Sequence, residues 1–432
     1  MQFGGGRRRA AGIALAAIVA ACCAAPAAHG VAARDGEMHL AGMATGAVIP
    51  NSWIVTLRSG DPDRVAAQHA RWGVHVQQVL HAALRGYTGR MSADLARRVA
   101  ADPRVRSVEQ DRVVRETSDW PTPGVSAPSG QSIPTGVSRV HAPESSARAG
   151  DGHGSVDADI AVLDTGIEAG HPDLNVAGGT DCVPGTTSWD DERGHGTHIA
   201  GIAAARDNDF GVVGVAPGAR VWAVRVLDAN GDGSLATLTC GIDWVTAHAG
   251  TIDVANMSLI GIDPGDGNCL DGGLHQAICT SVAAGVTYTV AAGNNAADAS
   301  SYSPASYPEV ITVGAIADYD GKPGGLADTP SACNGGGDDE FATFSNYGSV
   351  VDILAPGVCI RSTWLNGGYA TLTGTSQAAG YVAGAAALYR SGNPGATPTQ
   401  VREALREDAT GDYDMSTDPD DVPIRLLNVV DF

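Results

Sequence analysis

Short, wholly apolar runs alternate with helix-like segments from about residue 137 onward, and this alternation restricts the fold more than any other feature. Runs of this kind are typical of parallel strands that are buried on both faces. They lie at residues 159–163, 221–227, 252–257, 286–292 and 310–313, and helix-like spacing is found between them at 198–205, 235–249 and 272–284. The pattern predicts an α/β layer fold with a mostly parallel central sheet flanked by helices. In such a fold the functional residues gather at the carboxyl ends of the strands.

A smaller unit precedes this region. Residues 51–116 contain strand-like patterns at 53–57, 74–80, 86–91 and 105–114 and helix-like patterns at 62–72 and 92–101. The order β-α-β-β-α-β predicts a small α+β domain. Residues 117–136 are rich in proline, serine and glycine, a composition that cannot bury a core and predicts a linker. The large α/β domain is expected to span residues 137–432.

The first 28 residues predict an export signal. Three arginines, Arg7-Arg8-Arg9, precede an apolar run at 10–21, and small residues at 25–28 offer a cleavage site. The apolar run is too short for a membrane span. The segment 19–22 also fits a lipobox, in which Cys22 would carry a lipid anchor. Secretion is the favoured interpretation, and no membrane association is expected after processing.

The charge balance and the cysteines bear on the possible partners and on the expected disulfides. A formal net charge of −21 argues against a nucleic-acid partner, because such proteins carry basic patches. Six cysteines follow the signal, an even number that suggests disulfides in an exported chain and allows 15 pairings. The short separation of Cys269 and Cys279 favours a local bridge, a Cys333–Cys359 bridge would close a glycine-rich loop, and Cys182–Cys240 would remain. The cysteine spacing does not suggest a zinc site.

Four polar residues stand at strand ends or helix starts. Asp164 follows the first buried strand, His195 opens a helix between glycines, Asn294 follows another strand, and Ser376 precedes an alanine-rich helix. Three of them also have another interpretation: Asp164 as a turn aspartate, His195 as a metal ligand paired with His198, and Ser376 as a helix N-cap. Together they supply an orienting carboxylate, a base, an oxyanion donor and a nucleophile. The order Asp, His, Ser is the one found in subtilisin.

Further motifs carry a resemblance. Beside Asp164-Thr165-Gly166 and Gly374-Thr375-Ser376, these are residues 194–201, 291–295, 302–306 and 344–348. Residues 137–432 resemble a subtilase, a subtilisin-family serine peptidase, and are most similar to the proteinase K-like branch. Residues 51–116 resemble the inhibitory propeptide of that family. The resemblance implies a subtilisin-like fold and a secreted endopeptidase, made as a self-processed zymogen that is cut near Thr117.

The resemblance also implies a role for each site residue. Ser376 attacks the scissile carbonyl, His195 transfers the proton, Asp164 orients His195, and Asn294 with the Ser376 N–H holds the oxyanion. The segments Gly231-Asp232-Gly233 and Ser258-Leu259-Ile260 are expected to pair with the substrate backbone as an added strand. The implied partners are protein or peptide substrates and the chain's own propeptide, which acts as chaperone and inhibitor. A monomer is expected.

Catalysis is expected to need no cofactor, but the resemblance implies a structural calcium ion. Its ligands would be the carbonyl oxygens of Pro308 and Val310 and the carboxylate of Asp352. Oxygen ligands of this kind suit a hard cation such as Ca²⁺.

The chain departs from the family pattern near the nucleophile. Gln377 replaces a methionine that is open to oxidation, so we predict resistance to peroxide. Gly380-Tyr381 replaces Pro-His, and the glycine is expected to loosen the backbone behind Ser376 and to lower activity. Ile260 replaces a glycine beside the S1 pocket and is expected to change the preference for the P1 residue. These departures also raise an alternative, a non-catalytic binding or scaffold protein, against which the four intact site residues argue.

Overall fold

The N-terminal part of the chain forms a separate lobe. In the computed structural model, the described residues are 40, 42–118, 122–125, 130–262, 268–269, 273–420 and 422–432. The lobe, residues 48–116, contains β1 (Val48–Leu57), α1 (Pro62–Ala70), β2 (His75–Leu80), β3 (Gly86–Arg90), α2 (Ala93–Ala100) and β4 (Val105–Glu116). This is the predicted β-α-β-β-α-β order. The side chains of Asp61 and Ser92 cap the two helices by accepting from Arg64 N–H and Leu95 N–H.

The rest of the molecule, here called the body (residues 130–432), is built on a seven-stranded sheet. Its strand order is β14-β13-β12-β10-β6-β8-β7, and every neighbouring pair is parallel. The strands are β6 (Asp159–Asp164), β7 (Asn175–Asp181), β8 (Arg220–Arg225), β10 (Val254–Met257), β12 (Thr287–Ala291), β13 (Ile311–Ile316) and β14 (Ile353–Pro356). The predicted α/β fold with an N-terminal α+β unit is therefore confirmed.

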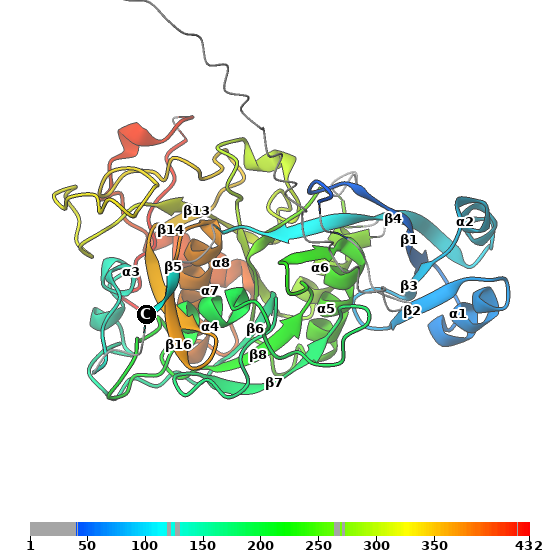
Figure 1. The fold of residues 1–432 in the computed structure, drawn as a ribbon, viewed down its shortest axis with the longest axis horizontal. Coiled ribbons are helices and arrows are strands. Elements are labelled where there is room, and N and C mark those ends of the chain that lie inside the picture. Colours follow the sequence, from blue (N-terminus) through cyan, green and yellow to red (C-terminus); the bar gives the residue numbers. More distant parts are fainter. Residues whose placement is uncertain are drawn as a thin grey trace, which may run out of the picture.

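Helices cover both faces of this sheet (Figure 1). Ile160 and Val162 of β6 belong to the core that includes α4 (His195–Ala204) and α7 (Thr375–Gly392), whereas Ala161 and Leu163 belong to the core that includes α5 (Leu235–Ala247) and α6 (Gly273–Ala283). Successive residues point to opposite faces, which is why the strands read as continuous apolar runs. The remaining helices are α3 (Thr135–Arg139), α8 (Pro398–Glu407) and the 3₁₀ turns η1 (Ala142–Glu144), η2 (Ala299–Ser301) and η3 (Met415–Thr417).

Strand β4 joins the lobe to the body. It runs out of the lobe across the body in Figure 1, and its end pairs antiparallel with β9 (Asp232–Ser234) and with β11 (Leu259–Ile260). A separate three-stranded sheet has the order β15-β16-β5, formed by β15 (Ile360–Trp364), β16 (Gly368–Leu372) and β5 (Thr122–Val125). Strand β5 lies within the predicted linker 117–136. The predicted signal, residues 1–28 with Cys22, lies outside the described residues.

Three disulfides link segments of the body. They join Cys182 to Cys240, Cys269 to Cys279 and Cys333 to Cys359, the pairings favoured by the sequence, with sequence separations of 58, 10 and 26 residues. Among the described residues, no helix combines the length and the apolar character that crossing a membrane requires.

Candidate active site

The four predicted polar residues meet at the carboxyl edge of the parallel sheet. Asp164 is the last residue of β6, His195 the first of α4, and Ser376 the second of α7. Asn294 follows the end of β12. Parallel strands deliver their carboxyl ends to one edge, and helix N-termini point their free N–H groups to the same edge. The elements that the sequence predicted therefore bring together residues up to 212 positions apart.

His195 is held by Asp164. Its Nδ1 lies 2.7 Å from Asp164 Oδ1, which also accepts from the Thr165 N–H at 2.7 Å. Gly196 makes this approach feasible, because a Cβ on Gly196 would lie 2.1 Å from the Gly166 carbonyl oxygen. The start of α4 can therefore pack against the loop after β6 only with a glycine at this position.

The charge of His195 is set by opposing effects. Complete burial lowers its pKa, but Asp164, then Glu116 of the lobe, attract the protonated form and raise the pKa to about 9. Glu116 Oε2 lies 3.9 Å from His195 Nδ1. At neutral pH the imidazole is therefore protonated while the end of β4 is in place.

The hydroxyl of Ser376 bonds to groups other than His195. It donates to the Ser258 carbonyl oxygen at 3.1 Å, and its oxygen lies 2.7 Å from the Thr117 hydroxyl. The Nε2 atom of His195 is buried and has no hydrogen-bond partner among the described residues. In this arrangement no hydrogen bond joins the predicted nucleophile Ser376 to the predicted base His195.

Asn294 and Ser376 contact the carbonyl of Thr117. The Asn294 amide donates to the Thr117 oxygen at 3.0 Å, and the Ser376 backbone N–H lies 3.4 Å from the same atom. Asn294 is oriented in turn by Thr375, whose N–H and hydroxyl donate to its Oδ1 at 3.0 and 2.7 Å. Two donors converge on one carbonyl oxygen, which is the geometry of an oxyanion hole.

The two predicted substrate segments contact β4. Val114 is in register with Gly233 and Arg115 with Asp232 on one side, and Leu259 is in register with Glu116 on the other. The other residues of the two segments also contact the end of the lobe. The Glu116 N–H donates to the Gly231 carbonyl oxygen at 3.2 Å, and the Thr117 N–H donates to that of Ser258 at 3.3 Å. Ile260 is in register with Arg115. The lobe therefore ends as a strand inserted between the two segments.

Two residues beside the candidate site, Asp191 and Arg193, were not singled out from the sequence. Asp191 is buried and accepts from the N–H groups of Arg193 (2.9 Å), Gly194 (2.8 Å) and Thr197 (3.0 Å), which fixes the turn before His195. Arg193 pairs with Glu116 at the end of β4. The available signal was position, since Asp191 and Arg193 lie within four residues of His195 in the sequence.

His198 has a structural role. Its Nε2 lies 3.1 Å from the Ile360 carbonyl oxygen and 3.2 Å from that of Ala370. Burial, followed by the charge of His195, lowers its pKa to about 3. A neutral imidazole that donates to these carbonyls holds α4 against β15 and β16 and does not form a metal site with His195.

An arginine side chain contacts the groups predicted to bind calcium. Arg402 of α8 donates from Nε to Asp352 Oδ1 at 2.8 Å and from Nη1 to the Pro308 carbonyl oxygen at 2.6 Å. The other oxygen of Asp352 accepts from the Thr312 N–H at 3.0 Å. The Arg402 guanidinium thus supplies positive charge at Asp352 and Pro308, two of the three predicted calcium ligands. The set, which includes Val310, does not fit a calcium ion in this arrangement, because the ion would have to displace Arg402.

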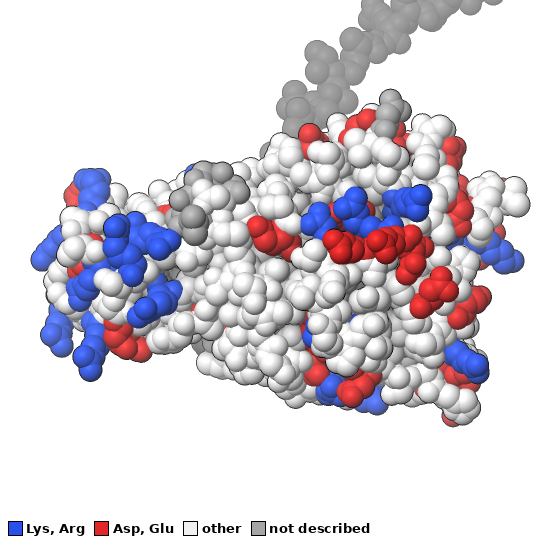
Figure 2. All heavy atoms as spheres, turned by 180° about the vertical axis from the view of Figure 1, so that it is seen from behind, with Lys and Arg blue, Asp and Glu red and all other residues white. Residues whose placement is uncertain are grey.

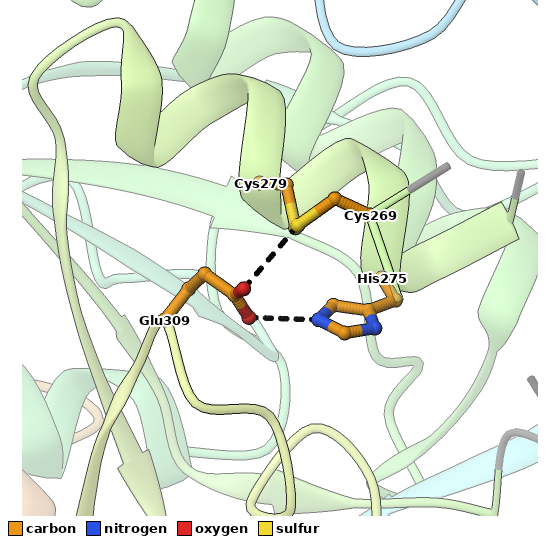
Figure 3. Close-up of side chains that lie close together, drawn as sticks. All are labelled: Cys269, His275, Cys279 and Glu309. Atoms are coloured by element: carbon orange, nitrogen blue, oxygen red, sulfur yellow. Dashed lines mark hydrogen bonds and ion pairs between the residues drawn. A yellow bond between two sulfur atoms is a disulfide. The ribbon is translucent and has the colours of Figure 1, made fainter. Parts of the chain in front are cut away.

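Two other groups of side chains have metal-ligand chemistry. Figure 3 shows Cys269, Cys279, His275 and Glu309, where His275 Nε2 lies 2.7 Å from Glu309 Oε2. The two sulfur atoms are joined in a disulfide, so neither is a thiolate ligand. In the second group, oxygens of Asp318, Asp320 and Asp338 lie within 4.8 Å of one another and could hold a metal. Asp318 already lies 3.3 Å from Arg139 Nε.

The residues that depart from the family pattern are buried. Gln377 is fully buried, and its amide nitrogen and oxygen have no hydrogen-bond partner among the described residues. Gly380 lies in α7, where a Cβ would be 3.2 Å from Ile202 Cγ2 of α4. Tyr381 packs near Gly136, and Ile260 lies beside Gly293, the residue before Asn294. Gly380 therefore allows α4 and α7 to approach closely, which gives it a packing role beside its expected effect on the backbone.

Fold and site together define a class of protein, the serine-type peptidases built on a parallel α/β sheet. The chain belongs to the subtilase family, because residues 156–421 match the sequence profile described as the subtilase family. It is 39% identical over 310 residues to M-protease from Shouchella clausii (strain KSM-K16), and the matched residues cover 72% of this chain and 70% of that protein. It is 41% identical over 280 residues to subtilisin Savinase from Lederbergia lenta, covering 65% of this chain and 92% of that protein. Among solved structures, a cold adapted subtilisin-like serine proteinase matches with a TM-score of 0.50 and 33% identity, covering 65% of this chain and 89% of that chain.

Proposed function

We propose that the protein is a secreted serine endopeptidase, made as a zymogen that cleaves itself between Thr117 and Ser118. One observation carries this proposal: the carbonyl of Thr117 stands at Ser376, with its oxygen 3.0 Å from the Asn294 amide. The backbone before it is paired on both sides, as a bound substrate would be. The lobe then acts as the inhibitory propeptide, and its last residues bind as the first substrate.

Each site residue has a definite part in the proposed reaction. The Ser376 hydroxyl turns from Ser258 to His195 Nε2, which takes its proton while Oγ bonds to the Thr117 carbonyl carbon. Negative charge passes to the carbonyl oxygen, where Asn294 and the Ser376 N–H stabilise it. His195 then gives the proton to the amine of Ser118, and the C–N bond breaks. Water hydrolyses the remaining acyl-enzyme by the same route. Asp164 orients His195 throughout.

The docked lobe opposes this reaction as well as supplying its first substrate. Glu116 adds negative charge beside His195 and so favours the protonated imidazole, which cannot act as a base. The Thr117 hydroxyl also forms a hydrogen bond with the hydroxyl of Ser376. Slow self-cleavage followed by release of the lobe would then separate synthesis from activity.

Several finer features belong to the same proposal. We expect a monomer that acts on proteins or peptides, with no nucleic-acid partner, either released after removal of residues 1–28 or anchored through Cys22. Placement in the proteinase K-like branch also remains a prediction.

A structural calcium ion at Pro308, Val310 and Asp352 would require Arg402 to move aside. Calcium titration of the melting temperature tests this, and an Arg402→Ala variant should gain calcium dependence.

Self-cleavage and proteolysis test the proposal. The purified wild type is expected to convert from the full chain to a product that begins at Ser118, and then to digest casein. Ser376→Ala should remain intact and inactive, since loss of such a serine lowers kcat by about 10⁶-fold. Ser391→Ala, at the far end of the same helix, is the matched control. A wild type whose lobe has been removed and that still leaves casein intact would favour the non-catalytic binding protein.

A further inference from the structure

The side chain of Glu116 is recognised by the body in a two-point contact. Glu116 precedes Thr117, so it occupies the P2 position of the proposed cleavage site. Arg193 Nε lies 2.8 Å from each carboxylate oxygen, and Nη2 makes a further contact with Oε1. The two side chains are only 10% and 16% exposed, so solvent screens this pair weakly. Paired, charge-assisted hydrogen bonds of this kind provide both affinity and directional selectivity.

Arg193 belongs to the body and remains in the cleft when the lobe leaves. Its backbone N–H donates to Asp191 Oδ1 at 2.9 Å, and the same carboxylate oxygen accepts from the Gly194 N–H at 2.8 Å. Asp191 thereby holds both Arg193 and the turn that begins α4 at His195. The guanidinium is therefore supported by the same turn as the proposed base.

We propose that Arg193 is a specificity-determining residue that selects substrates with an acidic side chain at P2. This inference rests on the proposed function and extends it to protein substrates other than the lobe. A glutamate at P2 would take the place of Glu116, whereas a neutral side chain would form at most a weaker hydrogen bond. A lysine at P2 would place its ammonium group beside the Arg193 guanidinium, and the two positive charges would repel each other.

The neighbouring position provides a comparison within the same cleft. Arg115, at P3, pairs with Asp232 through Nε at 2.6 Å, but its side chain is 30% exposed. A more exposed pair is screened more strongly and contributes less. Selection for charge should therefore be stronger at P2 than at P3.

Peptide hydrolysis tests the inference. The mature wild type is given peptides with the sequence of residues 114–117 at P4 to P1, in which P2 is Glu, Gln or Lys. We expect kcat/KM to fall about 10- to 100-fold from Glu to Gln, the usual effect of losing a hydrogen bond to a charged group, and to fall further with Lys. A parallel series with Arg or Gln at P3 should differ less.

Variants at Arg193 assign the preference to one side chain. In Arg193→Gln the ratio between the Glu and Gln peptides should approach one, and in Arg193→Glu the order should reverse in favour of Lys. Arg193→Lys should give an intermediate ratio, because a lysine keeps the charge but not the forked geometry.

The wild-type peptide series decides the question even if these variants fail to mature. Equal kcat/KM for the Glu, Gln and Lys peptides would overturn the inference and leave the proposed endopeptidase intact. A ratio that persists in Arg193→Gln would overturn it as well. A wild type that cleaves neither these peptides nor casein would instead remove the proposed function.

Discussion

The lobe and the body are stabilised in different ways. Residues 51–116 contain 11 arginines and 7 acidic residues, whereas residues 137–432 contain 12 cationic and 38 acidic residues. Figure 2 shows many basic side chains on the lobe at one end of the molecule, whereas on the body basic side chains lie beside acidic ones. The lobe contains no cysteine, and all three disulfides lie in the body. One part is therefore a small basic unit without cross-links, and the other is a large acidic unit with them.

Apart from the chain that connects the two parts, the contacts between them among the described residues are non-covalent. Asp243 of α5 accepts from the N–H groups of His81, Ala82 and Ala83 at 3.0, 2.8 and 2.7 Å. In the opposite direction, Asp111 of the lobe accepts from the Ala236 N–H at the start of α5, at 3.0 Å. The lobe residues Ile54, Leu80 and Leu84 also lie in the core on the α5 and α6 side of the sheet.

This difference bears on the proposed self-cleavage between Thr117 and Ser118. If the proposed cleavage occurs, the contacts that hold the lobe among the described residues are strand pairing, hydrogen bonds, ion pairs and shared apolar packing. The body keeps its disulfides and its two large cores. Under the proposed function we therefore expect the lobe to leave while the body persists, and the predictions below test each side of that contrast.

The largest effect is expected from removal of the Cys182–Cys240 disulfide. Closing a loop of 58 residues should stabilise the body by about 4 kcal/mol, because it restricts the unfolded chain. The double variant Cys182→Ala/Cys240→Ala should lose that free energy of unfolding, measured on the mature body in denaturant. The Cys269–Cys279 loop of 10 residues is the matched control and should cost nearer 3 kcal/mol. An equal or reversed order would show that native packing, and not loop length, sets the effect.

Asn294→Ala should keep the two parts joined. Loss of one oxyanion donor costs about 2.7–4 kcal/mol of transition-state stabilisation, so self-cleavage should slow by about 10²–10³-fold. The rate at which the full-length band disappears measures this. Asn295→Ala, at an exposed neighbouring position, is the control and should behave as the wild type. Because Asn294 also accepts from Thr375, melting temperatures must be compared, and an unchanged cleavage rate would exclude the amide from the reaction.

Asp243→Ala should loosen the lobe without altering the chemistry. Its carboxylate satisfies three backbone donors of the lobe, and hydrogen bonds to a charged group contribute about 1.5–3 kcal/mol. We expect the lag between self-cleavage and the appearance of casein hydrolysis to shorten by about 10- to 100-fold. Asp209→Ala removes an exposed carboxylate elsewhere on the body and serves as the control. A lag that is the same in both variants would mean that other contacts hold the lobe.

Much of this organisation could be predicted from the sequence. Asp164, His195, Asn294 and Ser376 stand directly after strands or at helix starts, and such positions are fixed by local patterns of apolar residues. The order of the lobe elements could be predicted because regular periodicity is a property of a single segment. The short separation of Cys269 and Cys279 likewise favoured their bridge, whereas Cys182–Cys240, 58 residues apart, was only the pair that remained. Short strands such as β9 and β11 were not assigned as strands, because their form depends on pairing with β4.

Contacts between distant side chains could not be predicted. Arg402 reaches Asp352 across 50 residues and Pro308 across 94, and no local signal distinguishes it from other arginines of a helix. Glu116 and Arg193 are 77 residues apart. The direction of the Ser376 hydroxyl likewise depends on Thr117 and Ser258, which belong to two different strand ends. Tertiary packing decides these details, and it is not encoded in the spacing of any one segment.

The smallest expected effect concerns the pH dependence of self-cleavage. The base must be neutral, and its pKa is raised to about 9 with the lobe docked, so the rate should rise with pH and level off above about 9. Part of that shift comes from Glu116, which lies 3.9 Å from His195. In Glu116→Gln the midpoint should therefore move to lower pH. Cleavage near pH 7 should be faster than in the wild type, because self-cleavage starts from the bound chain and does not include the P2 binding that enters kcat/KM for a free peptide. Arg115→Gln removes a charge at the adjacent position and should move the midpoint less. If the midpoint stayed at the wild-type pH in Glu116→Gln, the lobe would not control the charge of His195, and inhibition would rest on the covered hydroxyl of Ser376 alone.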